Sequence, residues 1–111
     1  MSFREIASKS RSEATALFKA APEPLRAFQN LMKVVGEEGA LSSKTKELMA
    51  LAIAVATRCE GCIVFHVQAS IRHHATREEV LETIAVAIEM SGGPGTVYGG
   101  KALAAYDELS G

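Results

Sequence analysis

The sequence has 111 residues, of which 48% are hydrophobic and 23% are charged, and its formal net charge is −1. These values indicate one domain, residues 1–111, with a modest core of its own. Lys and Arg form no basic patch, and the longest apolar run, Leu48 to Ala56, has about half the length of a membrane span, so we expect neither nucleic acid nor a membrane as a partner.

The first part of the chain predicts two helices. Residues 4–20 carry a patchy apolar face at helical spacing, formed by Ile6, Ala14, Leu17 and Phe18. Pro22-Glu23-Pro24 then breaks the chain and opens a second helix, because proline is tolerated in a first turn. The second helix continues at helical spacing until Gly36 to Gly39, through Leu25, Phe28, Leu31, Met32 and Val35.

A third helix is predicted over about residues 43–57, with Ser42 or Ser43 as its cap. Every residue after Glu47 is apolar as far as Ala56, on all sides of the helix. Such a helix is buried, either in a core or between subunits. A small domain has little interior for it, so the pattern predicts a homo-oligomer.

The second half of the chain predicts three more helices. Residues 60–74 carry an apolar stripe of Ile63, Val67 and Ile71, and Thr76 to Glu79 form a capping box that opens a fifth helix. Gly92-Gly93-Pro94-Gly95 is interpreted as a stop, and a last helix follows over about residues 96–109. The predicted fold class is all-α, a compact bundle of about six helices.

The N-terminus, residues 1–5, lacks the apolar core of a signal peptide, so we expect a cytoplasmic protein. Its only two cysteines, Cys59 and Cys62, are separated by two residues. A reducing cytoplasm makes a purely structural disulfide unfavourable, which shifts the interpretation of this pair toward catalysis or metal binding.

The segment Cys59-Glu60-Gly61-Cys62 suits a reversible thiol–disulfide centre. If it opens a helix, the free N–H groups of that helix end favour a thiolate. One thiolate can attack a peroxide or a disulfide, and the second thiol can then close an internal disulfide. His66 follows Cys62 by four residues, on the same helix face, where an imidazole can take the proton of a thiol.

Glu47 is a third candidate for proton transfer, because it is the last charged residue before the buried run. If helices three and four form an antiparallel hairpin around Arg58, Glu47 lies roughly 6 Å out of level with His66 along the helix axes. We therefore expect a bridging water, a kink or a neighbouring subunit to complete this contact.

Two other interpretations of the cysteine pair stay open on the residues alone. The cysteines could be small buried hydrophobes, or Cys59, Cys62 and His66 could be three ligands of a metal ion. A structural zinc site normally draws on two ligand-bearing segments, and here only one exists. His73 and His74 lie at the far end of the helix, about 10 Å or more beyond His66, and are interpreted as a solvated helix end.

The spacing of Glu47, Cys59-x-x-Cys62 and His66 resembles the AhpD-like alkylhydroperoxidases of the carboxymuconolactone decarboxylase family. The resemblance covers about residues 35–106, and it includes Lys46-Glu47-Leu48, the helix start at Ala75-Thr76, and Gly92-Gly93-Pro94 followed by Tyr98.

This resemblance implies an all-α fold, assembly into trimers or hexamers, and a thiol peroxidase mechanism without a cofactor or metal. Cys62 would attack a hydroperoxide or disulfide substrate, and Cys59 would supply a proton and then close the disulfide. His66 and Glu47 would form a proton relay, and a dithiol of lipoyl type would reduce the disulfide.

Two features depart from the best-known peroxidases of the group. Those proteins have a His immediately before the second Cys, where this chain has Gly61, and they are nearly twice as long. The chain thus resembles the single-domain branch. The decarboxylases that name the family lack the Cys pair, so we do not expect lactone decarboxylation. A non-enzymatic redox sensor or interaction module, switched by the same cysteines, is the alternative function.

Overall fold

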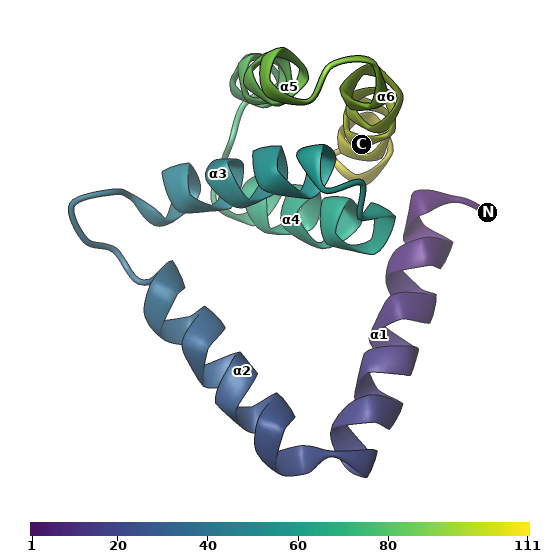
Figure 1. Ribbon diagram of the computed structural model, residues 1–111, viewed down its shortest axis with the longest axis vertical. Helices are drawn as coiled ribbons and strands as arrows, with labels where there is room; N and C mark the ends of the chain where they lie inside the picture. Colours follow the sequence, from purple (N-terminus) through teal and green to yellow (C-terminus); the bar gives the residue numbers. More distant parts are fainter.

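The computed structural model describes residues 1–111 and contains six α-helices and no strand, which confirms the predicted all-α class (Figure 1). The predicted helix limits agree closely with the structure except at the start of the last helix. The helices in chain order are α1 (Phe3–Ala20), α2 (Pro22–Gly36), α3 (Ser43–Ala56), α4 (Glu60–Arg72), α5 (Arg77–Ser91) and α6 (Gly93–Leu109). None of them is long and apolar enough to cross a membrane.

The core lies among the last four helices. Helices α3 and α4 run side by side as a hairpin, and α5 and α6 pack on one side of this pair (Figure 1). Large aliphatic side chains from three of these helices are fully buried where the helices meet, namely Leu51, Val55, Ile63, Val67 and Val80. Burying each of them contributes roughly 1.5–3 kcal/mol, so this core holds the α3–α4 hairpin in a fixed geometry.

Helix α5 and helix α6 approach closely because glycines of α6 face α5. A Cβ added at Gly99 would lie 2.7 Å from Cγ2 of Ile84, and one at Gly95 would collide with the Ser91 side chain. The predicted break between the last two helices, from Gly92 to Gly95, is therefore too long. Only Gly92, with φ of +72°, separates the two helices, and Gly95 already lies inside α6.

Helix α1 is held at its N-terminal end. The carboxylate of Glu108, near the end of α6, accepts hydrogen bonds from the backbone N–H groups of Phe3 (3.1 Å) and Arg4 (2.9 Å). An anion is favourable at a helix N-terminus, where N–H groups lack partners within the helix. This contact fixes the end of α1, from which α1 runs past α4 and away from the core (Figure 1).

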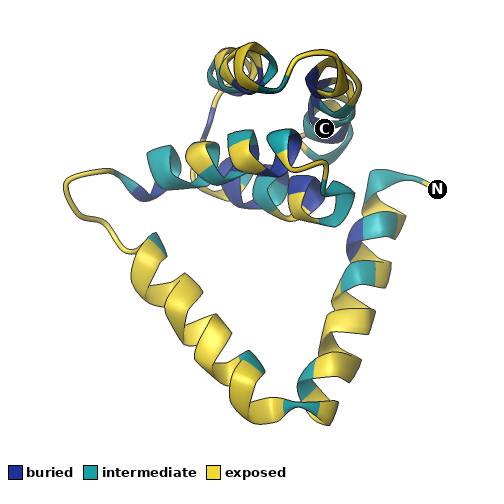
Figure 2. Ribbon diagram, in the orientation of Figure 1, coloured by how far each residue is buried: buried dark blue, intermediate teal, exposed yellow.

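Helix α2 has no buried residue, and it is almost entirely exposed in Figure 2. Its apolar side chains Phe28, Leu31 and Val35 are each more than half exposed. Its C-terminal end is fixed to α3, because Nζ of Lys46 donates to the backbone oxygens of Val35 (2.9 Å) and Glu37 (2.6 Å). The chain therefore holds an uncovered apolar helix in a defined position.

Helix α3 is buried on one face only. Leu51 and Val55 are inaccessible to solvent, but Met49 and Ile53 on the outer side are 50% and 61% exposed. A single chain therefore does not bury α3 on all sides, as expected for a domain with so small an interior. Burial of the outer face between subunits stays a prediction.

Candidate active site

The Cys pair begins helix α4. Cys59 is the N-cap residue of this helix and is joined to Cys62 by a disulfide, with Cα atoms 5.2 Å apart. The Sγ atom of Cys59 also accepts the backbone N–H of Cys62 at 3.3 Å. The expected arrangement, two sulfurs within bonding reach at a helix start, is thus present, and neither cysteine is a buried hydrophobe of the core.

The two sulfurs differ in accessibility. Cys62 is exposed and Cys59 is half-buried. The N-terminal end of α4 favours a negative charge on both sulfurs when they are reduced. Cys62 is therefore the more accessible of the two sulfurs.

The charge of Glu60, between the cysteines, has a partner on α6. Nζ of Lys101 lies 3.2 Å from Oε2 of Glu60, although both side chains remain about two-fifths exposed. The ammonium group offsets the carboxylate next to the two sulfurs, where a second negative charge would disfavour a thiolate. An exposed pair of this kind contributes little to stability, so its significance is electrostatic.

Glu47 and His66 meet directly. Oε2 of Glu47 lies 2.8 Å from Nδ1 of His66, and both side chains are about one-fifth exposed. The predicted offset of roughly 6 Å between these residues along the helix axes is therefore wrong, and no water, kink or second subunit is needed to join them.

The reason for the difference lies in the turn between α3 and α4. Arg58 adopts the left-handed conformation with φ of 58°, and the N–H of Cys59 then bonds to the carbonyl oxygen of Ala54 at 3.1 Å. Ala54 and Cys59 therefore lie opposite each other, at the same height along the hairpin of α3 and α4. Glu47 lies seven residues before Ala54, and His66 lies seven residues after Cys59, so the two are level as well.

This contact determines what the imidazole can do. When the ring is neutral, the proton that Nδ1 donates to the carboxylate leaves the lone pair on Nε2. A carboxylate in this position holds the ring in one tautomer and stabilises it when it gains a second proton. The ring of Phe65 packs edge-on against the imidazole, with ring centroids 5.0 Å apart, and further limits its rotation.

Cys62 and His66 line the same small cavity. It has a volume of about 230 Å³, and α3 supplies the other side, which is mainly apolar and is formed by Ala50, Ile53, Ala54 and Thr57. The sequence interpretation missed this wall. The signal was present, because these four residues recur at intervals of three and four from Glu47 and so share its face of α3.

The histidines at the other end of α4 do not join this site. His73 and His74 are exposed beyond the last turn of the helix. No group of three or more His, Cys, Asp or Glu side chains is arranged so that it could hold a metal ion. The imidazole of His66 is instead engaged with Glu47.

A sequence model of the carboxymuconolactone decarboxylase family matches residues 22–106, which include all four site residues. The chain belongs to this family. The solved structure of a family member from Legionella pneumophila shares 42% sequence identity and a TM-score of 0.95, covering 98% of this chain and 97% of that one. A family member from Thermotoga maritima, for which a part in the antioxidative response has been suggested, is 28% identical with a TM-score of 0.83, covering 93% and 88% of the two chains.

Two sequence relatives also match most of this chain, and their names state no activity. An uncharacterised protein of Cupriavidus necator is 46% identical over 95 residues, which cover 86% of this chain and 84% of the relative. An uncharacterised protein of the cox locus of Paracoccus denitrificans is 46% identical over 85 residues, covering 77% of each chain. The AhpD-like fold of the family fits the six helices described above.

Proposed function

We propose that the protein is a thiol-dependent peroxidase, an AhpD-like oxidoreductase in which Cys62 reacts with a hydroperoxide and Cys59 closes the disulfide. The observation that carries the proposal is the 2.8 Å contact between Glu47 and His66, next to a cavity that His66 shares with Cys62. A base held by a carboxylate, an accessible sulfur and a second sulfur in bonding reach are the parts that this chemistry needs.

The proposed cycle begins with both thiols reduced. Nε2 of His66 takes the proton of Cys62, and the thiolate attacks one oxygen of the hydroperoxide. The O–O bond breaks, Cys62 becomes a sulfenic acid, and the leaving alkoxide takes a proton to become an alcohol. Cys59 then attacks the sulfur of Cys62, a disulfide forms, and the hydroxyl group leaves as water.

The protonated imidazole beside Glu47 supplies the proton for the leaving oxygen, so the pair works as a relay. The disulfide is returned to two thiols by exchange with an external dithiol, for which we propose a lipoyl-type compound. The mainly apolar wall of the 230 Å³ cavity favours an organic hydroperoxide over hydrogen peroxide. A disulfide substrate would react by the same attack of Cys62.

Gly61 bears on the efficiency of this cycle. A Cβ at this position would lie 3.5 Å from Oγ of Ser10, so α1 passes directly over the residue. The best-known peroxidases that this sequence resembles have a His here, and this chain has no side chain to transfer a proton from that side. We therefore propose that the relay depends on His66 and Glu47 alone.

The experiment follows consumption of cumene hydroperoxide with dihydrolipoamide as the reductant, in the wild type and in the variants Cys62→Ser and Cys59→Ser. We expect Cys62→Ser to abolish all reaction. In a separate reaction of the pre-reduced protein without added dithiol, Cys59→Ser should consume about one equivalent of peroxide per chain and then stop, because a sulfenic acid forms but neither Cys59 nor an external thiol can convert it to a disulfide. Unchanged turnover in both variants would end the proposal.

The second candidate function is a redox sensor or interaction module. It is favoured by the exposed apolar side chains of Met49 and Ile53 on α3, because Ile53 lines the same cavity as Cys62. Reduction of the disulfide would then change which partner, or which second copy, covers this face. Measuring the assembly size of the oxidised and reduced protein separates the two functions, since a change of assembly without peroxide turnover favours the sensor.

We also propose that the protein forms a homo-oligomer, a trimer or a hexamer, in the cytoplasm. The support for the assembly is the uncovered apolar face of α2, where Phe28, Leu31 and Val35 are each more than half exposed. Contiguous exposed apolar surface of this kind marks an interaction site.

A further inference from the structure

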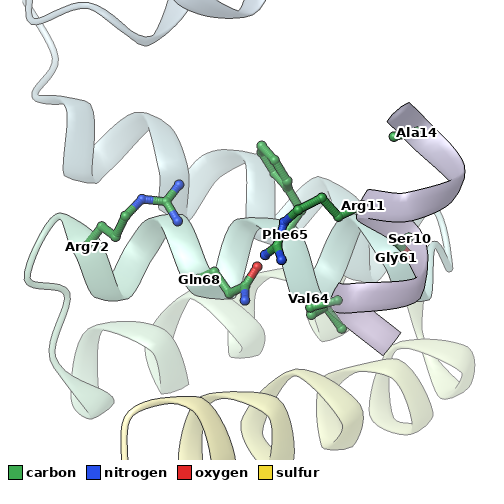
Figure 3. A pocket seen from close by; sticks show the side chains of 9 residues that line it. Ser10, Arg11, Ala14, Gly61, Val64, Phe65, Gln68 and Arg72 are labelled. Carbon is green, nitrogen blue, oxygen red and sulfur yellow. The ribbon is translucent and has the colours of Figure 1, made fainter. Parts of the chain in front are cut away.

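A second cavity lies between α1 and α4, on a different face of α4 from Cys62 and His66. It has a volume of about 340 Å³, and Figure 3 shows the side chains that line it. Its apolar walls come from both helices, including Ala14, Val64 and Phe65, and it extends to Gly61 inside the Cys pair. The cavity adjoins a second hollow of about 430 Å³, which shares Arg11, Gln68 and Arg72 with it.

The cationic groups of this groove have no anionic partner. Arg11 on α1 and Arg72 on α4 form no ion pair within 4.0 Å, whereas Arg4, at the far end of the adjoining hollow, is paired with Glu108. In Figure 3 the guanidinium group of Arg11 reaches from α1 toward the side-chain amide of Gln68 on α4. The groove therefore has a cationic, hydrogen-bonding part and an apolar part that ends at Gly61, between the two cysteines.

This combination selects a particular ligand chemistry. A guanidinium group binds a carboxylate through two parallel hydrogen bonds, and the amide of Gln68 can donate a further one. The apolar walls need a hydrocarbon chain to replace water. A free inorganic anion would leave the apolar part empty, and an uncharged hydrocarbon would leave both arginines without a partner.

We propose that the groove between α1 and α4 binds a carboxylic acid with a medium-length hydrocarbon chain. The carboxylate lies between Arg11 and Arg72 beside Gln68, and the chain runs along Val64 and Phe65 toward Gly61. This site is separate from the peroxidase centre and does not depend on the proposed function. Arg11 and Ala14 also lie outside residues 22–106, so the α1 side of the site belongs to a part of the chain that the family match does not cover.

Isothermal titration of the purified, assembled protein with decanoate, below its micelle concentration, tests the proposal. We expect one decanoate per chain, with decanol and acetate binding at least about tenfold more weakly, because each lacks one half of the required chemistry. The double variant Arg11→Gln/Arg72→Gln should weaken decanoate binding by a factor of about ten or more.

The matched control is Lys9→Gln/Lys33→Gln, which changes the net charge equally at exposed positions that line neither hollow. It should bind decanoate like the wild type. Ala14→Phe, from an exposed position, should block the apolar part without changing any charge. Absence of binding to the wild type, or equal weakening in both double variants, would overturn the proposal. The titration contains neither peroxide nor reductant, so its outcome is independent of the outcome of the peroxidase assay.

Discussion

Glu47 joins the imidazole of His66 at its Nδ1 atom, which places the carboxylate on the side of the ring away from the nitrogen that would serve as a base. Its role in the proposed reaction is therefore to orient and stabilise the ring. The neutral amide of Gln occupies nearly the same volume as the carboxylate but cannot stabilise an imidazolium. The substitution Glu47→Gln therefore tests the effect of the negative charge while keeping the size of the side chain.

We predict that Glu47→Gln slows the reaction of reduced Cys62 with cumene hydroperoxide by roughly 10²-fold, the size of a typical acid–base contribution. The measurement is a single-turnover reaction stopped by acid at short times. Glu89→Gln, which removes an exposed carboxylate on α5 outside the site, should react like the wild type. An unaltered rate in Glu47→Gln would show that the carboxylate has no part in the reaction.

At the scale of elements, the close approach of α5 and α6 depends on residues without side chains. We predict that Gly99→Ala destabilises the fold by about 1–3 kcal/mol, because the added methyl group would press against Cγ2 of Ile84 in a packed interface. The neighbouring Gly100 has no atom within 4 Å of an added Cβ, so Gly100→Ala should instead stabilise α6 by roughly 0.5–1 kcal/mol.

Urea unfolding of the two glycine variants measures both effects. Opposite signs are expected, since the two substitutions are chemically the same and differ only in what the methyl group meets. A stability for Gly99→Ala equal to that of Gly100→Ala would contradict the packing described here.

The start of α5 is joined to α3 by the carboxylate of Glu79. It accepts the N–H of Thr76 at 2.8 Å in the capping box, and its second oxygen lies 2.9 Å from Nζ of Lys44. The hydrogen bond from the Thr76 backbone, followed by the contact with Lys44, lowers the pKa of Glu79 below its ordinary value of 4.5. A lowered pKa in the folded state means that the carboxylate contributes stability above pH 4.5, and that this contribution is lost as the pH falls through the folded-state pKa.

We therefore predict that Glu79→Gln lowers the thermal midpoint at about pH 7, and that its difference from the wild type shrinks as the pH falls below 4.5. Thermal scans at both ends of this range provide the measurement. Glu82→Gln, at an exposed position of the same helix without an ion pair, should show neither effect. A difference that stays constant with pH would exclude the ionised carboxylate as its cause.

At the scale of the whole molecule, α2 is the element whose exposed apolar face a single chain does not explain. Its apolar face is uncovered, while its ends are fixed by the prolines at its start and by Lys46 at its end. An amphipathic helix held in this way gains stability only if another surface covers it.

We predict that Leu31→Glu reduces the assembly to a smaller species, because a charge would be buried in the contact between copies. Light scattering coupled to size-exclusion chromatography measures the mass. Asn30→Glu adds the same charge at the adjacent exposed position and should leave the assembly intact. A wild-type protein that is monomeric would contradict the prediction at once.

The helices could be predicted from sequence because their signals are local. The capping box at Thr76 and the prolines at the start of α2 each determine a boundary through neighbouring residues, and both boundaries agree with the structure. The start of α6 was misplaced because the close packing of Gly95 against α5 is not visible in a local pattern. In a local pattern, a glycine at position 95 is typical of a break between helices.

The grouping of the candidate site residues could be predicted from the sequence, but their geometry could not. The Cys pair and His66 lie on one helix, so their spacing places them together. The contact between Glu47 and His66 depends on the left-handed conformation of Arg58, which determines which residues of α3 and α4 lie opposite each other. Counting residues from the middle of the turn did not take this conformation into account. The groove between α1 and α4 depends on how two helices distant in sequence lie together, and no pattern along the chain indicates it.

The central claim is that His66, held by Glu47, takes the proton of Cys62. The most direct measurement is the single-turnover rate of reduced protein with cumene hydroperoxide, compared between the wild type and His66→Gln. The account predicts a rate lower by roughly 10²–10⁴-fold in His66→Gln at about pH 7, recovering toward the wild-type rate as rising pH ionises the thiol without a base. Equal rates for the two proteins at neutral pH would contradict it.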